Sequence, residues 1–490
     1  MYAATHSAVR SGFSVESVLV ECQLTKSLPG ISISGLASGP ALEARERVRG
    51  ALRSAGFSEL LMKNFVVNLR PAELPKRDSH VDAAIFMAIV LAGGYSSSKE
   101  KFVYFGTLGL DGSLQGSPAA LVCALDRASQ GEKVIIPFDL GHMISLIPNL
   151  NKFCRCAKNV KDLLENNFSI PETLSKEIDE NCSSIWDSIL GHKMLKEALI
   201  VAAAGEHHIL LYGPPGTGKT MLASSLVEIL PPIHVSQRWE VARLSALEGD
   251  TNKVISILTH GRPPHSQPHH TASSVALVGG GTPPRPGAVS TAYQGVLVLD
   301  ELPEFAPRAL DALRQPLEDG HVSIYRAGGK MIAPATRLIA ATMNLCPCGE
   351  YGKENSSCTC SVFKRNAYLA RISGPLRERF DIRVPVLTVT QHDSKNEITL
   401  KEAIEKVTTA RKILEKKSTL SLTYLQSLLQ DDKTKAHLKE ISNSIGGIGR
   451  GLHRILRLAR TIAAIDERYT ITSIDLEKAW NWRGRLTSWQ

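Results

Sequence analysis

The sequence predicts a protein of the α/β class that is divided into several domains. Three observations lead to this prediction: a length of 490 residues, the stretch GPPGTGKT between a strand-like and a helix-like segment, and helical spacing of apolar residues after Val389. At about 150 residues per domain, such a chain forms about three domains. Hydrophobic residues make up 43% and charged residues 21%, a globular composition that excludes a fibrous or disordered protein.

Four segments differ in pattern. Residues 1–165 interleave alternating stretches such as VESVLVEC and NFVVNLR with helix-like ones such as GPALEARERVRGALRSAG, which predicts an α+β domain. Residues 166–184 are polar and predict a linker. Residues 185–390 contain HILLY and GPPGTGKT and predict the α/β core, and residues 391–490 predict a helical domain.

The composition also bears on location and partners. The net charge of +9 favours polyanionic partners, and it equally fits a basic protein without a nucleic-acid role. The N-terminus lacks the pattern of a secretory signal, and the most apolar run, from Ala83, is shorter than the roughly 20 residues of a membrane span. Nine cysteines, mostly scattered, fit a reducing compartment. We therefore expect a cytoplasmic protein without a membrane partner.

The stretch GPPGTGKT fits the pattern G-x-x-x-x-G-K-[ST] and lies between a strand and the helix-forming MLASSLVEIL, as a phosphate-binding loop requires. Its glycines let backbone N–H groups close around phosphate oxygens, and the helix N-terminus adds a favourable dipole. Lys219 is predicted to reach the β- and γ-phosphates of ATP, and the Thr220 hydroxyl to bind Mg²⁺. The predicted nucleotide-binding residues of this loop are Gly213, Pro214, Pro215, Gly216, Thr217, Gly218, Lys219 and Thr220.

Two more apolar strands end in polar residues. GVLVLDE ends in Asp300 and Glu301, and the carboxyl ends of strands in an α/β sheet are where ligands bind. Asp300 is predicted to hold Mg²⁺, directly or through water, and Glu301 to orient and deprotonate the attacking water. RLIAATMN ends in Asn344, which suits positioning of that water; a simple turn residue is the alternative.

Sequence blocks beyond these motifs resemble the magnesium-chelatase-like AAA+ ATPase family of bacteria. They are HHTASSVALVGGG, LDELPEF, LRQPLEDG, MNLCPCG and SGPLRERFD in the central region, and LPGISISGL, EARERVRGALRSAGF and VNLRPAELPK nearer the N-terminus. The resemblance covers nearly the whole chain. It implies an AAA+ P-loop ATPase core with a helical lid, preceded by a Lon-protease-like α+β domain of the ribosomal-protein-S5 domain-2-like fold.

The resemblance also implies roles for two arginines. Arg379 falls where the family places its arginine finger, which a neighbouring subunit presents to the γ-phosphate; Arg377 lies where the family usually has an apolar residue. Arg450 matches the sensor-2 arginine of the lid, with Arg454 as the alternative. A finger that acts on a neighbouring subunit requires an oligomer, and the family implies a hexameric ring.

The Lon-like domain is predicted to be non-proteolytic. Lon requires a nucleophilic Ser and a Lys base, and acyl transfer by that mechanism has no route without them. Aligning HVDAAIFMAIVLAGG with the Lon nucleophile motif puts Asp82 near the position of the serine, and GSLQGSPAALVCAL offers no Lys. We therefore expect an accessory domain that engages DNA or holds the ring together.

Two segments are candidates for the channel of such a ring. Residues 249–294 form an insertion rich in Gly, Pro and His, and HVSIYRAGGKMIAPATR predicts a hairpin with Gly328 and Gly329 at its turn, flanked by Arg326 and Lys330. Cations at a hairpin tip suit contact with a DNA phosphate backbone. A solvated hairpin whose charges only aid solubility is the alternative.

The family resemblance implies a DNA motor, a branch-migration helicase that helps incoming single-stranded DNA to pair with the chromosome in natural transformation. A protein-remodelling ATPase of the magnesium-chelatase type, acting on a partner protein, is the alternative. Trp480, Trp482 and Trp489 are able to stack bases, although tryptophans of a helical domain more often serve packing.

Four cysteines lie within fifteen residues after Asn344. Two C-x-C pairs with nine residues between them offer enough thiolates for one tetrahedral Zn²⁺, although this spacing is tighter than the usual C-x₂₋₄-C. The polar stretch between the pairs has little apolar surface, so a metal would supply the missing stability; four reduced thiols in a surface loop are the alternative. The predicted zinc ligands are Cys346, Cys348, Cys358 and Cys360.

Overall fold

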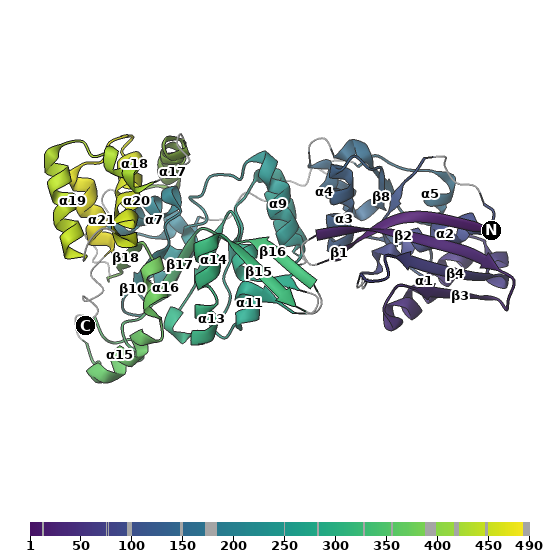
Figure 1. Ribbon diagram of the computed structural model, residues 1–490, viewed down its shortest axis with the longest axis horizontal. Helices are drawn as coiled ribbons and strands as arrows, with labels where there is room; N and C mark the ends of the chain where they lie inside the picture. The colour runs from purple at the N-terminus through teal and green to yellow at the C-terminus, as the bar shows by residue number, and fades with distance from the viewer. Residues whose placement is uncertain are drawn as a thin grey trace.

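The computed structural model is elongated, with the N-terminal domain at one end and the helical lid at the other (Figure 1). It describes residues 1–11, 14–74, 76, 78–95, 100–147, 150–171, 184–248, 250–281, 284–326, 329–353, 356–387, 398–415, 421–445 and 449–483. Among these residues, no helix combines the length and the apolar character that crossing a membrane demands.

The N-terminal domain contains a seven-stranded mixed sheet in the order β3-β4-β2-β1-β5-β8-β9. Val18, Val20 and Cys22 of β2 are buried, because alternate side chains of a strand face the same side of a sheet. The strands are β1 (Tyr2–Ser11), β2 (Ser14–Thr25), β3 (Gly30–Ser34), β4 (Asn64–Arg70), β5 (Val103–Tyr104), β8 (Val134–Pro137) and β9 (Cys154–Ala157), with a separate pair β6 (Thr107–Leu108) and β7 (Leu114–Gln115).

Helices cover this sheet and form its core. Helix α2 is buried nearly all round and packs between α1 and the sheet, which explains the apolar run from Ala83 as a core helix. Phe168 contacts Phe102 edge-on with 5.5 Å between ring centroids, and Ser169 pairs with Cys156, so the domain continues past residue 165. The helices are α1 (Ser38–Ser54), α2 (Asp82–Ala92), α3 (Pro118–Ser129), α4 (Gly141–Ser145) and α5 (Val160–Glu165).

The central domain contains a parallel five-stranded sheet in the order β11-β14-β17-β10-β18. Its inner strands are short apolar runs that are buried on both faces, as parallel sheets are. Because the strands are parallel, their carboxyl ends meet at one edge. The strands are β10 (Ile209–Tyr212), β11 (His265–Ser266), β14 (Val296–Leu299), β17 (Ile339–Met343) and β18 (Ile382–Pro385).

Helices and two strand pairs surround the central sheet. The helices are α6 (Ile185–Ser188), α7 (Lys193–Gly205), α8 (Lys219–Ser225), α9 (Val235–Ala246), α10 (Thr251–His260), α11 (Ser274–Val278), α12 (Ala288–Thr291), α13 (Pro307–Asp311), α14 (Arg314–Asp319), α15 (Val362–Ala370) and α16 (Gly374–Arg379). The strand pairs are β12 (Gly279–Gly280) with β13 (Arg285–Pro286) and β15 (His321–Arg326) with β16 (Gly329–Pro334).

The predicted hairpin forms, but Gly329, which was expected at its turn, lies in a strand. Arg326 pairs with Gly329 at the end of the β15–β16 ladder. Gly328, the other glycine expected at the turn, lies outside the described part of the chain, as do the side chains of Arg326 and Lys330.

The C-terminal lid is helical and shares one apolar core with the central domain. Trp482 is buried in this core and Trp480 packs against it, which favours the packing interpretation of both; Trp489 lies outside the described residues. The helices are α17 (Leu400–Glu415), α18 (Leu422–Ser427), α19 (Asp432–Ser444), α20 (Arg450–Ile465) and α21 (Ser473–Arg483).

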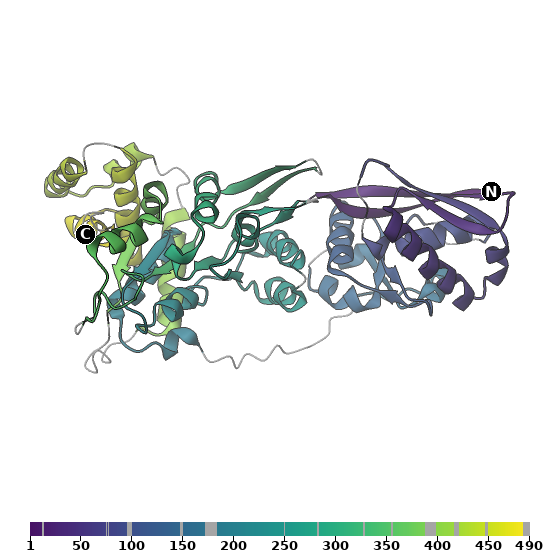
Figure 2. The same cartoon turned by 90° about the horizontal axis from the view of Figure 1, so that it is seen from below.

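The N-terminal and central domains also share an apolar core. Val241 of α9 and Val254 of α10 are buried in the same cluster as Leu121 of α3 and Met143 of α4, and Figure 2 shows this junction from below. Helix α10 lies in the segment 249–294, which the sequence made a candidate for the ring channel. Within the described residues, this helix packs against the N-terminal domain instead.

Candidate functional site

The glycine-rich loop follows β10 and opens helix α8. Gly216 and Gly218 have φ angles of +78° and +82°, which glycine adopts without steric cost. The hydroxyl of Thr220 donates to Asp300 Oδ1 at 3.0 Å, and that of Thr342 on β17 donates to the same oxygen at 2.5 Å. The hydroxyl and the carboxylate that were expected to hold Mg²⁺ therefore lie in direct contact, and the donor set fits this ion.

Lys219 is buried at the base of the loop. Its Nζ donates to the backbone carbonyls of Gly213 at 3.0 Å and Pro214 at 2.5 Å, and Thr217 Oγ1 donates to the same Pro214 carbonyl at 2.9 Å. Burial lowers the pKa of Lys219, and the two carboxylates after β14 oppose this shift. A phosphate oxygen is a stronger partner for an ammonium group than these neutral carbonyls, so the side chain is placed to exchange them for a ligand.

Glu301 directly follows Asp300 and has a φ of +53°, an uncommon backbone conformation for a residue other than glycine. Its backbone N–H donates to Thr342 Oγ1 at 3.0 Å, which fixes this turn to β17. Its Oε2 lies 3.6 Å from Nδ1 of His270.

His270 is a residue of the site that the sequence reasoning missed. The sequence analysis placed HHTASS in a family-like block and in the channel-candidate segment 249–294, and it gave neither histidine a role in the nucleotide site. His270 follows the edge strand β11, which pairs in parallel with β14, so both strands bring their following residues to the same edge. The feature that would have identified His270 is strand β11. This strand has only two residues, and its sequence is typical of a loop.

Asn344 follows β17 and is half-buried. The backbone N–H of Gly213 donates to the Met343 carbonyl at 3.2 Å, so the first residue of the glycine-rich loop is bonded to the residue before Asn344. Since β10 and β17 are direct neighbours, Asn344 lies at the same sheet edge as Lys219 and Glu301.

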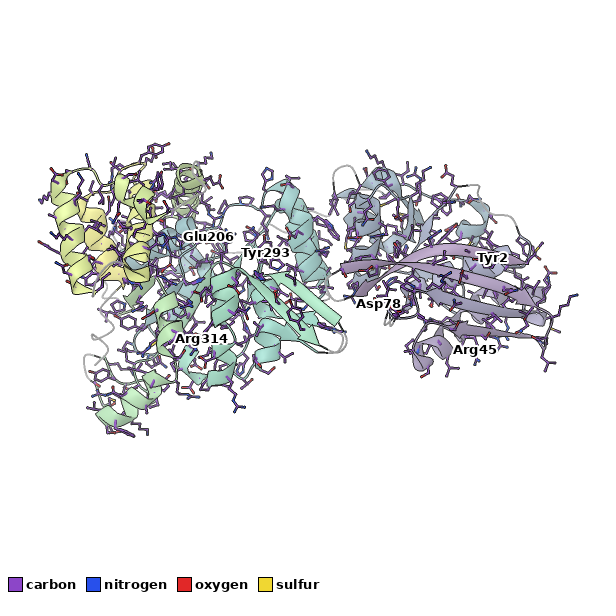
Figure 3. All side chains as sticks on the ribbon, in the orientation of Figure 1. Tyr2, Arg45, Asp78, Glu206, Tyr293 and Arg314 are labelled. Atoms are coloured by element: carbon purple, nitrogen blue, oxygen red, sulfur yellow. The ribbon has the colours of Figure 1, made fainter. Side chains whose placement is uncertain are left out.

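Arg379 lies at the end of α16, and its Nη2 is 2.6 Å from Glu318 Oε2 on α14. At the other end of α16, Ser373 donates to Asp311 at 3.1 Å. Figure 3 shows Arg314 of α14 in this part of the domain, where it pairs with Asp311 at 2.7 Å. Helix α16 is therefore attached to the α13–α14 segment at both ends, and Glu318 holds the guanidinium of Arg379.

The two lid arginines differ in their surroundings. Arg450 is the first residue of α20, and its side chain lies outside the described part of the chain. Arg454 donates to the Glu378 carbonyl at 2.6 Å and pairs with Asp381 at 3.3 Å. Burial opposes ionisation of Asp381, but the hydrogen bond with His207 and the charge of Arg454 hold its pKa well below the usual range. Arg454 thus forms an ion pair with the residue that precedes β18. This position is at the opposite end of the strand from the carboxyl edge of the sheet.

The residue near the Lon nucleophile position is a structural carboxylate. Asp82 is fully buried and accepts hydrogen bonds from Arg47 Nε at 2.6 Å and from the Leu108 N–H at 3.3 Å. Burial raises the pKa of Asp82, and the contacts with Arg47 oppose this shift. At this position the chain therefore has a buried, paired carboxylate in place of a hydroxyl group.

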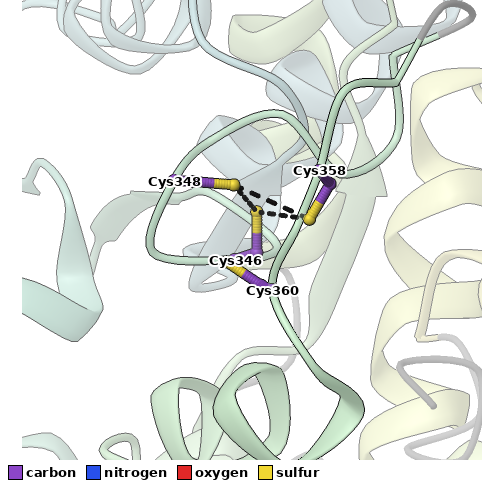
Figure 4. Close-up of side chains that lie close together, drawn as sticks. All are labelled: Cys346, Cys348, Cys358 and Cys360. Carbon is purple, nitrogen blue, oxygen red and sulfur yellow. Dashed lines mark hydrogen bonds between the residues drawn. The ribbon is translucent and has the colours of Figure 1, made fainter.

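The four predicted zinc ligands converge (Figure 4). Their Sγ atoms all lie within 4.8 Å of one another; the separations are 3.2 Å for Cys346–Cys348, 3.6 Å for Cys348–Cys358 and 3.8 Å for Cys346–Cys358. Four thiolates around a tetrahedral Zn²⁺ at 2.3 Å are about 3.8 Å apart. Hydrogen bonds from the Glu350 backbone and from Cys346 lower the pKa of Cys348 to about 7, which favours the metal-binding thiolate. The donor set therefore fits zinc.

Comparison with known proteins agrees with this architecture. Three family models match the chain: "Magnesium chelatase, subunit ChlI" over residues 186–394, "Subunit ChlI of Mg-chelatase" over 20–139 and "Magnesium chelatase, subunit ChlI C-terminal" over 397–483. Lon protease 2 of Bacillus subtilis is 30% identical over 161 residues, which cover 32% of this chain and 28% of that protein.

Several relatives match over nearly their whole length, including the following two. Competence protein ComM of Haemophilus influenzae is 34% identical over 507 residues, which cover 99% of this chain and 98% of that protein. The uncharacterized protein YifB of Escherichia coli is 33% identical over 502 residues, which cover 98% of this chain and 96% of that protein. These matches confirm the predicted AAA+ core and Lon-like N-terminal domain. Because the family models match most of the chain and the chain is similar to ComM and YifB over nearly its whole length, it belongs to the magnesium-chelatase-like family of AAA+ ATPases.

Proposed function

We propose that this protein is an ATP-hydrolysing, ring-forming DNA motor, a branch-migration helicase that promotes integration of single-stranded DNA during natural transformation and homologous recombination. The observation that carries the proposal is the contact between Thr220 and Asp300, which joins the phosphate loop to the strand that ends in the catalytic carboxylates. The similarity to a competence protein over 99% of the chain supports the DNA part.

The carboxyl edge of the sheet supplies the groups for ATP hydrolysis within one subunit. Backbone N–H groups of the loop and Lys219 bind the triphosphate, and Thr220 with Asp300 holds Mg²⁺, which neutralises phosphate charge. Glu301 accepts the proton of the attacking water, and Asn344 donates a hydrogen bond that positions this water.

Two arginines complete the site. Arg379 reaches the γ-phosphate of a neighbouring subunit and stabilises the charge that develops there. Arg450 of the lid binds the phosphates of its own subunit. The first of these roles requires a ring, and we propose a hexamer. Four thiolates of the cysteine cluster hold one structural Zn²⁺, which contributes folding free energy.

Replacement of His270 by Ala is expected to lower kcat for ATP hydrolysis by about tenfold and to leave nucleotide affinity unchanged. The imidazole lies 3.6 Å from Glu301 Oε2 and restricts the orientation of this carboxylate, and it lies outside the phosphate loop. Steady-state kcat and the dissociation constant of a fluorescent ATP analogue are the two measurements.

His269 is the matched control for this variant. Its ring stacks on that of His270 at 4.0 Å, and its Nδ1 bonds Thr271. His269→Ala is expected to change kcat less than His270→Ala does. Equal losses in both variants, or weaker analogue binding in His270→Ala alone, would show that the histidine pair supports the fold rather than Glu301.

The DNA part is tested by ATP hydrolysis in the presence of DNA. Forked and single-stranded DNA are expected to stimulate the wild-type rate. The double variant Arg326→Ala with Lys330→Ala is expected to lose this stimulation and to reduce the slope of log affinity against log salt by about 1.4, because two phosphate contacts are removed from a single strand. Both positions lie at the end of the β15–β16 ladder, and backbone contacts of this kind carry no sequence preference.

A double variant with the same loss of charge elsewhere is the control. Arg308 and Arg337 are exposed and lie outside the hairpin, so Arg308→Ala with Arg337→Ala is expected to retain stimulation. Absence of stimulation of the wild-type protein by any DNA would contradict the motor. That result would favour the alternative, a protein-remodelling ATPase, for which the match to magnesium-chelatase subunit models is the supporting observation.

A further inference from the structure

The cysteine loop packs against the two prolines of the phosphate loop. A β-carbon placed on Gly349 would lie 3.1 Å from Cγ and 3.2 Å from Cδ of Pro215, and one placed on Gly352 would lie 3.8 Å from Cγ of Pro214. Both glycines have left-handed backbones, with φ of +80° and +95°. A methyl group at Gly349 would therefore crowd the Pro215 ring, whereas one at Gly352 would lie at an ordinary contact distance from Pro214.

Pro214 in turn determines where Lys219 lies. The Pro214 carbonyl accepts hydrogen bonds from Lys219 Nζ and from Thr217 Oγ1. A proline ring restricts its own backbone, so displacement of the ring displaces this carbonyl too. A continuous set of contacts thus runs from the sulfur cluster through Gly349 and Gly352 to the lysine that binds phosphate.

The sulfur cluster is the strongest attachment of this loop. Two further contacts of the loop lie near the surface: Lys353 pairs with Glu350 at 2.6 Å, and the Arg365 guanidinium lies 4.0 Å from the ring centre of Tyr351. Ion pairs and cation–π contacts in such exposed positions contribute little. Inside the cluster, Cys346 is buried and accepts a hydrogen bond from the Tyr351 N–H at 3.3 Å.

We propose that Zn²⁺ bound by the four cysteines sets the affinity for ATP by holding the cysteine loop against Pro214 and Pro215. The inference rests on the proposed ATPase function and adds metal-dependent control of the same site. Zinc closes four thiolates into one tetrahedral unit, and this closure supplies the order that the polar loop lacks. Loss of the metal releases the loop, and the phosphate loop loses the surface against which its prolines pack.

The test compares zinc content and nucleotide affinity in the full-length protein. Cys358→Ser is expected to lose zinc by elemental analysis and to bind a fluorescent ATP analogue about tenfold more weakly or worse. Thr359→Ala is the matched control, because Thr359 is the adjacent residue, is exposed and carries no thiol. It is expected to retain both zinc and affinity.

A second variant keeps all four thiols. Gly349→Ala is expected to retain zinc and still bind the analogue more weakly, because its methyl group would lie 3.1 Å from the Pro215 ring and its φ of +80° disfavours any side chain. If circular dichroism shows that Cys358→Ser does not fold, Gly349→Ala alone tests whether the loop sets the affinity for ATP.

The outcomes separate this inference from the ATPase proposal. A wild-type protein without zinc overturns the inference, and so does wild-type affinity in a folded, zinc-free Cys358→Ser or in Gly349→Ala. If the wild-type protein binds no analogue, or if Lys219→Ala binds it as tightly, the nucleotide site itself is wrong and the inference fails with it.

Discussion

Glu301→Gln is expected to bind ATP with nearly wild-type affinity and to hydrolyse it about 10²- to 10⁴-fold more slowly. The amide has the shape of the carboxylate but does not accept the proton of the attacking water. The substitution leaves Thr220, Asp300 and Lys219 in place, so the groups proposed to bind phosphate and Mg²⁺ are unchanged. Single-turnover hydrolysis and equilibrium binding of a fluorescent ATP analogue measure the two effects separately.

Glu304 provides a matched control for this variant. It lies three residues further along the same segment, is partly exposed, and pairs with Arg371 at 3.4 Å. Glu304→Gln is expected to hydrolyse ATP at the wild-type rate. A wild-type rate in Glu301→Gln would show that another group is the base, and loss of analogue binding would place Glu301 among the Mg²⁺ ligands.

The convergence of the residues proposed to bind nucleotide could be predicted because each part of that set is contiguous in sequence. The loop from Gly213 to Thr220, the pair Asp300 and Glu301, and Asn344 each end or follow an apolar strand. Because the strands are parallel, their carboxyl ends lie at one edge of the sheet, and no knowledge of the tertiary structure is needed to predict this. Thr220 and Asp300 are separated by 80 positions in the chain and yet are in hydrogen-bond contact.

Contacts made by irregular segments were not predictable in this way. His270 reaches Glu301 from a strand of two residues, which no periodicity reveals. Glu318 meets Arg379 from a helix of six residues that lies 61 positions earlier. The cysteine spacing predicted a cluster, but the approach of Gly349 to Pro215 depends on the tertiary path of the loop.

Composition concealed one helix. The segment 249–294 is rich in Gly, Pro and His on average, and this suggested a loop that enters a channel. Its first part is the ten-residue helix α10, in which Val254, Ile257 and Leu258 are buried. Their spacing of three and four residues marks one apolar face, and a window restricted to this stretch would have predicted a helix that packs against another surface.

Arg379→Ala is expected to bind ATP and to reduce hydrolysis by about 10³-fold or more, the effect of an arginine that stabilises the transferring phosphoryl group. In the single chain this guanidinium is held by Glu318 of α14 at 2.6 Å, and the other end of α16 is bonded to Asp311 of α13. A finger of this kind acts on the neighbouring subunit, so its loss leaves the subunit's own phosphate loop intact.

Mixing two inactive variants tests the action between subunits. Arg379→Ala retains a complete nucleotide site, and Lys219→Ala retains a complete finger. A ring that contains both has interfaces where one chain supplies the site and the other the finger, so the mixture is expected to regain activity that neither variant has alone. Arg377→Ala, two positions away on the same helix, is the control and is expected to keep the wild-type rate. A mixture no more active than its components would contradict a finger in trans, because only a residue that completes a neighbour's site can be complemented in this way.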